Sequence, residues 1–347
     1  MISRWYLLHD IIGGKLLDYE SPERMRRVNT KMINYIFKTA KYNFSHKEMF
    51  NAKSIFLLAT NRKTLINNKY YNRYVDHFYE EYPEQSLVIE QAPLDWEWPF
   101  PRVNADVYFD AIGRVEGEIR SRFYYKKDYV KVCEMLMLFC KRVKLLFDIR
   151  IQNKEFEYIA IYISKLIVSM RYQSIWLNKK LTKDTKVVIA VGSGFPDYYF
   201  TNRMLRRRGI ISVELQHGYI TKNNIMYNYA DVLVNKAQVK AGIPDFILTY
   251  GEWWNSQMNC PIKKVSIGNP YHEYCIKKIS QVSKKNRNIL IIGVGENTRD
   301  YISLAAFLRK NIKDYHTKFR PHPGEMIKAI KIINEGGYSI ELDKNID

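Results

Sequence analysis

The chain has 347 residues and a hydrophobic fraction of 46%, which suits about two folded domains and excludes extensive disorder. Its formal net charge of +19 at pH 7 allows three kinds of anionic partner: nucleic acid, a membrane surface or an anionic substrate. The basic residues are interleaved with apolar ones, and no zinc-finger, RNP or KH signature is present. We therefore expect an anionic membrane surface as a partner, and no nucleic acid.

Compartment and membrane contact follow from what the sequence lacks. The four cysteines form no CxxC pair, which is typical of reduced cysteines in a cytoplasmic protein. Neither a signal peptide nor an apolar run of about 18 residues is visible. We expect a cytoplasmic protein that is peripheral at the inner face of the cell membrane.

The first half of the chain mixes helical and strand patterns. Long amphipathic helices are predicted where apolar residues recur every three or four positions. The elements expected here are basic helical material from 1 to about 50, strands at 54–59 and 86–90, a Pro-rich loop at 93–101, and helices at about 115–147 and 154–181.

A regular alternation of strands and helices begins at residue 187. The apolar run 187–191 is typical of a parallel strand covered on both faces, and a helix is predicted from about Asp197. The segments that follow are a strand at 210–215, an apolar segment at 230–234, and strands at 246–250 and 265–267.

A polar and basic stretch, 271–287, is predicted to link an N-terminal domain, 1–270, to a C-terminal domain, 288–347. The predicted elements of the second domain are strands at 288–292, 316–319 and 339–342, with helices from about 299 and after 323. A doubly wound half usually has five or six strands, so we expect the C-terminal domain to be truncated. The predicted fold is α/β, with two Rossmann-like domains facing one cleft.

The motif Gln216-His217-Gly218 directly follows the strand 210–215. Open α/β sheets place ligand-contacting groups just past their strand ends. An imidazole titrates near neutrality and suits proton abstraction from an acceptor hydroxyl, so we predict His217 as the catalytic residue. The alternative is a loop histidine hydrogen-bonded to backbone. The other residues predicted on the acceptor side are Gln216, Gly218, Gly192, Gly194 and Asp197.

A second motif, Arg320-Pro321-His322-Pro323, follows the strand 316–319. The prolines fix the backbone, the guanidinium can contact phosphate in a bidentate manner, and a helix N-terminus follows. We predict that Arg320 and His322 bind a donor phosphate; the alternative is a structural proline turn. The turn after the strand 288–292 adds Gly293, Gly295, Glu296 and Asn297 as nucleotide-binding candidates.

Motifs for bound cofactors are missing from the sequence. The glycine turn is not GxGxxG, and no metal-ligand spacing, P-loop or GxSxG motif is present. We therefore expect neither a cofactor nor a metal.

Taken in order, these motifs resemble GT-B glycosyltransferases of bacterial surface-polysaccharide synthesis. The resemblance covers roughly residues 185–347 and includes Thr249-Tyr250-Gly251-Glu252 and Gly268-Asn269-Pro270. The His-Pro pair is similar to the donor-phosphate motif of sialyl-, polysialyl- and Kdo transferases and of CDP-glycerol polymerases. The resemblance implies a CMP-sugar or CDP-polyol on Arg320 and His322, and a lipid-linked capsule, lipopolysaccharide or teichoic-type acceptor at His217. Those families carry a Ser/Thr motif beyond the His-Pro turn, which this chain does not reach.

Two other functions stay open. A non-hydrolysing UDP-sugar 2-epimerase resembles the same fold and has a similar Gly-Asn turn before its linker, but its further acidic and histidine motifs are not found here. A basic nucleic-acid-binding protein would show a steep loss of oligonucleotide binding with salt.

Overall fold

The chain folds into two compact units, Met1–Glu273 and Tyr274–Asp347. Each unit contains a parallel sheet with helices, so the predicted α/β fold class is confirmed. The computed structural model describes residues 30–46, 50, 53–59, 63–91, 98–104, 107–148, 151–224, 226–279, 287–294, 297–322 and 325–343. Residues 1–29 and most of the Pro-rich segment therefore lie outside the described part of the chain.

A seven-stranded, all-parallel sheet forms the centre of the first unit. Its strand order is β5-β4-β1-β6-β7-β8-β9. Strands β4 and β5 are added on one side of β1, and β6 to β9 are added on its other side. The order reverses between β1 and β6, which is the topological switch point of a doubly wound sheet. The strands are β1 Ile55–Ala59, β4 Ser86–Glu90, β5 Val107–Phe109, β6 Val187–Val191, β7 Ile211–Leu215, β8 Phe246–Thr249 and β9 Lys263–Ser266.

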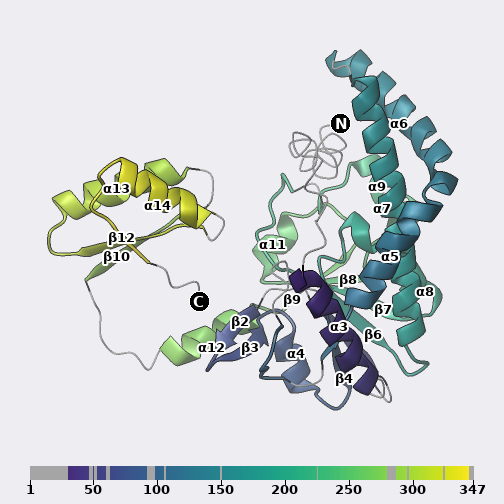
Figure 1. Ribbon diagram of the computed structural model, residues 1–347, viewed down its shortest axis with the longest axis horizontal. Helices are drawn as coiled ribbons and strands as arrows, with labels where there is room; N and C mark the ends of the chain where they lie inside the picture. Colours follow the sequence, from purple (N-terminus) through teal and green to yellow (C-terminus); the bar gives the residue numbers. More distant parts are fainter. Residues whose placement is uncertain are drawn as a thin grey trace. The chain divides into compact units, whose positions relative to one another are not determined.

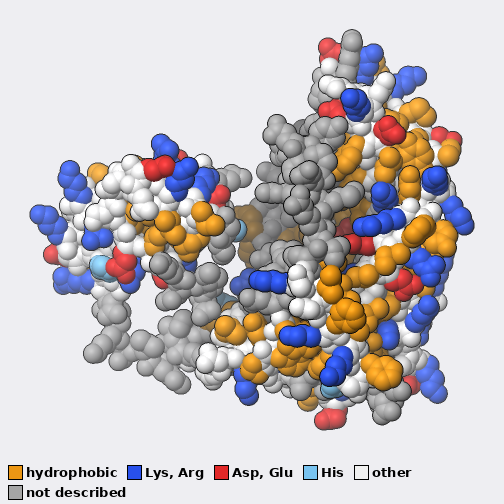
Figure 2. Space-filling view, viewed as in Figure 1, with side chains coloured by type: hydrophobic (Ala, Val, Ile, Leu, Met, Phe, Trp, Pro, Cys, Tyr) orange, Lys and Arg blue, Asp and Glu red, His pale blue; other side chains and the backbone are white. Residues whose placement is uncertain are grey.

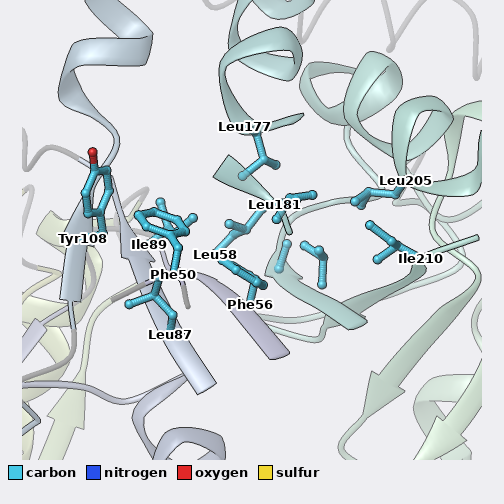
Figure 3. Packing of buried hydrophobic residues seen from close by; sticks show 12 residues of the cluster. Phe50, Phe56, Leu58, Leu87, Ile89, Tyr108, Leu177, Leu181, Leu205 and Ile210 are labelled. Carbon is cyan, nitrogen blue, oxygen red and sulfur yellow. The ribbon is translucent and has the colours of Figure 1, made fainter. Parts of the chain in front are cut away.

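Hydrophobic clusters cover both faces of this sheet. Neighbouring residues of a strand point to opposite faces, so β1 contributes Leu58 to one cluster and Leu57 to the other. On the first face, two helices contribute Leu177 and Leu205 (Figure 3). On the second face, Phe78 is among the side chains that cover the strands. This double cover explains why the strands are continuous apolar runs in the sequence.

Several short helices of the first unit were not predicted, and one predicted helix differs from the structure. The single helix predicted at about 115–147 is wrong, because two helices meet at Tyr125. That residue keeps helical dihedral angles (φ −59°, ψ −28°), so the apolar periodicity runs through the break and does not reveal it. The helices are α3 Thr30–Ser45, α4 Asp76–Glu81, α5 Ala111–Tyr124, α6 Lys126–Phe147, α7 Asn153–Lys180, η5 Pro196–Tyr198 (a 3₁₀ turn), α8 Tyr199–Arg207, α9 Asp231–Val234, α10 Ala237–Gly242 and α11 Glu252–Ser256.

Helix α5 lies very close to α7. A Cβ atom added at Gly113 would lie 2.5 Å from the Trp176 ring, and one added at Gly117 would lie 2.9 Å from the carbonyl oxygen of Ser169. Glycine at these positions therefore lets the two helices pack face to face. Both α5 and α6 contact α7 (Figure 1). A short antiparallel hairpin, β2 Lys63–Ile66 with β3 Lys69–Asn72, is a further element that the sequence did not reveal.

The second unit contains a three-stranded parallel sheet in the order β10-β11-β12. Helices α13 and α14 cover one face of it, around Phe319 (Figure 1). On the other face the strands leave Leu290 42% and Ile292 59% exposed. Helix α12 spans the division between the units, where the sequence predicted a polar linker. The elements are α12 Pro270–Ile279, β10 Asn288–Ile292, α13 Thr298–Asn311, β11 His316–Arg320, α14 Met326–Glu335 and β12 Glu341–Leu342.

Candidate functional site

His217 lies just past the end of β7, at the carboxyl edge of the large sheet, where the sequence placed it. Its backbone carbonyl accepts a hydrogen bond of 2.9 Å from the Tyr74 hydroxyl. Its imidazole meets the rings of Phe195 and Tyr74 edge-on, with centroid distances of 5.7 and 6.5 Å. The residue as a whole is half-buried, and the Nδ1 atom of its ring is buried. The aromatic neighbours therefore fix the position of the imidazole.

Gln216 and Gly218 flank this histidine and behave differently. The Gln216 side chain is 2% exposed, donates to the carbonyl of Gly218 (2.9 Å) and accepts from the N–H of Tyr250 (2.8 Å). Its amide thus joins the loops after β7 and β8, and its role is to position backbone. Gly218 is exposed, and nothing lies within 4 Å of where its Cβ would be. The fold itself therefore does not require glycine there.

The small space beside Gln216 does not fit a sugar. It measures about 20 Å³ and is lined by Tyr74, His77, Tyr250 and Asn269, among others. A cavity of this size holds about one water molecule. An acceptor that reaches His217 must therefore approach from the exposed side of the Gly218 loop.

Glu214 is a buried carboxyl that the sequence reading did not select. It points away from Val213 and Leu215 and is fully buried. The N–H of Gly194 donates to it at 2.7 Å, and the Tyr227 hydroxyl donates to its other oxygen. Burial raises the pKa of Glu214 to about 7, although these two hydrogen bonds partly offset the shift. The signal in the sequence was a single acidic residue inside an apolar strand.

Glu214 should make the stability of the protein depend on pH. A carboxyl with a raised pKa in the folded state binds its proton more tightly there. The free energy of unfolding should therefore fall as pH rises from about 4.5 to about 7, and stay lower above that. Glutamine resembles the protonated acid. We therefore expect Glu214→Gln to lack this pH-dependent decrease in the free energy of unfolding, which is on the order of 3 kcal/mol. Urea unfolding at pH 5 and pH 8 measures the difference, with the exposed Glu134→Gln as control. Equal pH dependence in Glu214→Gln and the unsubstituted protein would contradict this assignment.

The loop after β6 holds the remaining residues predicted on the acceptor side. Gly192 has a φ of +75°, which favours glycine, and a Cβ at Gly194 would lie 2.5 Å from the Glu214 carboxylate. Both glycines therefore have structural roles. Asp197 follows on η5 and lines a cavity together with Leu58 and Ile89. Those two residues belong to the face of the sheet opposite to Leu215, so Asp197 and the pocket beside Gln216 do not form one site.

A buried ion cluster at the end of β4 was also missed. The Arg102 guanidinium contacts the carboxylate of Glu90 at 2.5 Å and that of Asp76 at 3.7 Å, and all three side chains are at most 1% exposed. Burial raises the pKa of Asp76 to about 6, and the charge of Arg102 partly offsets that shift. The cluster joins the segment 98–104 and α4 to the sheet. Removing one member of such a cluster leaves an uncompensated buried charge, so a structural role explains it.

In the second unit, Arg320 is the last residue of β11. Its Nε and Nη2 atoms donate to the Asp343 carboxylate at 3.0 and 2.6 Å. Phe319 is buried under the helices, so strand alternation turns Arg320 to the uncovered face, beside its register partner Ile292. The guanidinium therefore stands at the carboxyl edge of the sheet, already paired with one carboxylate. An incoming phosphate would have to compete with Asp343.

His322 follows in the turn that leads to α14 and is exposed. The N–H of Glu325 donates to its carbonyl at 2.8 Å. Hydrogen bonds from Lys328 and Thr298 hold the pKa of Glu325 below its usual range, and the charge of His322 adds to this. The turn thus places the His322 imidazole near the Glu325 carboxylate at the start of α14.

The other nucleotide-binding candidates lie at the same edge. Gly293 continues the ladder by donating to the carbonyl of Arg320 at 2.8 Å, and Asn297 precedes the first residue of α13. The structure therefore brings Gly293, Asn297, Arg320 and His322 to one edge of one sheet. Gly295 and Glu296 lie outside the described residues.

Metal-ligating side chains do not gather in the described ranges, where no three His, Cys, Asp or Glu side chains come close enough to share a metal ion. The four cysteines are free.

No protein-family model and no curated protein sequence matches the chain. Among solved structures, it is similar to a UDP-N-acetylglucosamine 2-epimerase from Rickettsia bellii, with 8% identity and a TM-score of 0.39. The match covers 84% of this chain and 68% of the other. A likeness at this level carries no argument about activity.

Proposed function

We propose that the protein is a metal-independent glycosyltransferase that moves a sugar or polyol phosphate from a cytidine nucleotide to a bacterial surface glycan on a lipid carrier. The observation that carries the proposal is the gathering of Arg320, His322, Gly293 and Asn297 at one carboxyl edge of the small sheet. Arginine suits phosphate recognition, and the carboxyl edge is where parallel sheets bind ligands. In this proposal His217 activates the acceptor hydroxyl.

In this proposal the two motifs have different roles. Arg320 and His322 neutralise the phosphate that leaves with the nucleotide, while the His217 imidazole takes the proton of the attacking hydroxyl. The two aromatic neighbours support this role, because they hold the imidazole in place while the residue as a whole stays half-buried.

A screen of nucleotides by thermal unfolding tests the donor. A ligand that binds only the native state raises the melting temperature, so CMP or CDP should raise it more than UDP or GDP at equal concentration. A flat response to all four nucleotides would contradict a nucleotide donor. A response to UDP, together with turnover of UDP-N-acetylglucosamine in the absence of an acceptor, would instead indicate an epimerase.

We further propose that the protein docks on an anionic membrane surface through α6. Among the described residues no helix is both long and apolar enough to cross a bilayer. Helix α6 carries six lysine and arginine residues against two carboxylates. Helical spacing aligns Met135, Leu138, Arg142 and Leu145 on one stripe, and the three apolar members are 64%, 65% and 83% exposed. Figure 2 shows exposed hydrophobic side chains among Lys and Arg in the region that α6 occupies in Figure 1.

A double substitution tests this docking surface. Replacing Met135 and Leu138 with glutamate removes buried apolar area at the membrane and adds two negative charges, so binding to vesicles with anionic phospholipid should fall at least about tenfold. Phe307→Glu, which is equally exposed but lies on α13, should bind normally. Co-sedimentation with anionic and with purely zwitterionic vesicles measures the effect. Unchanged binding of the double variant would show that this stripe of α6 is not the docking surface.

A further inference from the structure

A cavity of about 290 Å³ opens at the topological switch point of the large sheet. It is lined by residues from the carboxyl ends of β1, β4 and β5, from the turn after β6, and from α5 and α7. The strand order of a doubly wound sheet reverses at this place, and the connections on the two sides leave a crevice there. The volume is at the lower end of the ~300–1,000 Å³ range of small-molecule sites, so one ring with its substituents fits.

Hydrogen-bonding groups at the mouth of the cavity both donate and accept. Arg114 contacts Asp110 through Nε at 2.7 Å, which leaves the other guanidinium N–H groups available. Gln91 donates to the Tyr198 hydroxyl at 3.4 Å. Burial raises the pKa of Tyr198 to about 12, so that hydroxyl keeps its proton and can donate. These groups come from three separate segments of the chain.

Asp197 completes this set. It is solvent-accessible at the cavity mouth, and no described residue donates a hydrogen bond to its carboxylate. Partial desolvation raises its pKa, and the charge of Arg114 partly offsets the shift. A carboxylate that faces a cavity without a protein donor is an acceptor for a ligand hydroxyl.

The walls of the cavity are apolar. Trp176, Leu166 and Met170 line it on the side of α7, and Leu58 and Ile89 on the side of the sheet. Two carboxylates face one guanidinium at the mouth, so an anionic ligand is disfavoured. A sugar ring combines C–H faces that pack on apolar walls with hydroxyls that donate and accept at its edge.

We propose that this cavity binds one uncharged sugar ring, with its hydroxyls hydrogen-bonded to Asp197, Arg114, Gln91 and Tyr198. The site is complete within the first unit and needs no nucleotide. The proposal therefore goes beyond the transferase function and does not rest on it.

Saturation-transfer NMR with the whole chain tests the proposal, using glucose, galactose and N-acetylglucosamine as neutral probes, N-acetylneuraminic acid as an anionic probe, and cytidine as a planar one. At least one neutral sugar should give a signal without nucleotide. Asp197→Ala should weaken its binding at least about tenfold, as expected when a charge-assisted hydrogen bond is lost. Asp197→Asn, which keeps the side-chain shape, should lose less.

Two control variants locate the signal. Asp184→Ala lies in the exposed turn before β6, at the opposite edge of the same sheet, and should bind the sugar normally. Arg320→Ala should also leave sugar binding unchanged, so a failed nucleotide site and a failed sugar site are distinguishable. Three results would overturn the proposal: no signal from any neutral sugar, full binding in Asp197→Ala, or a signal from cytidine or N-acetylneuraminic acid alone.

Discussion

Replacing Arg320 with alanine is expected to weaken the binding of CMP and CDP by about 10- to 150-fold, the usual effect of losing a charge-assisted hydrogen bond. The reason is that Arg320 places a guanidinium at the carboxyl edge of β11, next to the turns that precede α13 and α14. Titration calorimetry with each nucleotide measures the change. His322→Ala should act in the same direction, with a smaller or equal effect.

The ion pair with Asp343 makes this experiment sharper. Asp343 accepts two hydrogen bonds from the guanidinium, so Asp343→Asn should free it for phosphate and tighten nucleotide binding. Arg309→Ala is a matched control, because Arg309 is an exposed arginine in the last turn of α13, at the far end of that helix. If Arg320→Ala binds CMP and CDP normally in a folded protein, the ion pair with Asp343 is the whole role of Arg320 and the phosphate assignment is wrong.

The sequence revealed the parallel strands because burial on both faces leaves a continuous apolar run. Strands β4 and β6 begin and end where the pattern predicted. The division of α5 from α6 was not visible, because Tyr125 keeps helical dihedrals and is neither glycine nor proline. The short strand β5 and the hairpin of β2 and β3 were missed for a related reason. Segments of three or four residues contain too few positions to show a period, and the equally short β8 and β9 were found because they continue a regular alternation of strands and helices.

The candidate site was predictable only where a motif marks a strand end. His217 and Arg320 were found in this way, and both lie at carboxyl edges. The cavity at the switch point could not be found, because its polar groups come from residues as far apart as Gln91 and Asp197 and depend on the strand order. The role of Gln216 also needed the structure, since only the fold shows that its amide holds the backbone of two loops.

The His217 substitutions concern the chemical step. If His217 is the base, His217→Ala should leave nucleotide binding nearly intact and lower transfer about 10²- to 10⁴-fold. Loss of the ring also removes its contacts with Tyr74 and Phe195, so a lower melting temperature is expected and does not by itself indicate a structural role.

His217→Phe separates the two explanations, because a phenyl ring keeps the edge-on contacts with Tyr74 and Phe195 but cannot take a proton. If His217 is a base, the phenylalanine variant should recover the melting temperature of the unsubstituted protein but stay inactive, and the loss of activity should appear in kcat. A structural histidine predicts that stability and transfer return together. A loss confined to KM in both variants would place His217 on the acceptor without a role in proton transfer. We expect the first result, because aromatic neighbours fix the imidazole at the carboxyl edge of the large sheet, in a residue that is only half-buried.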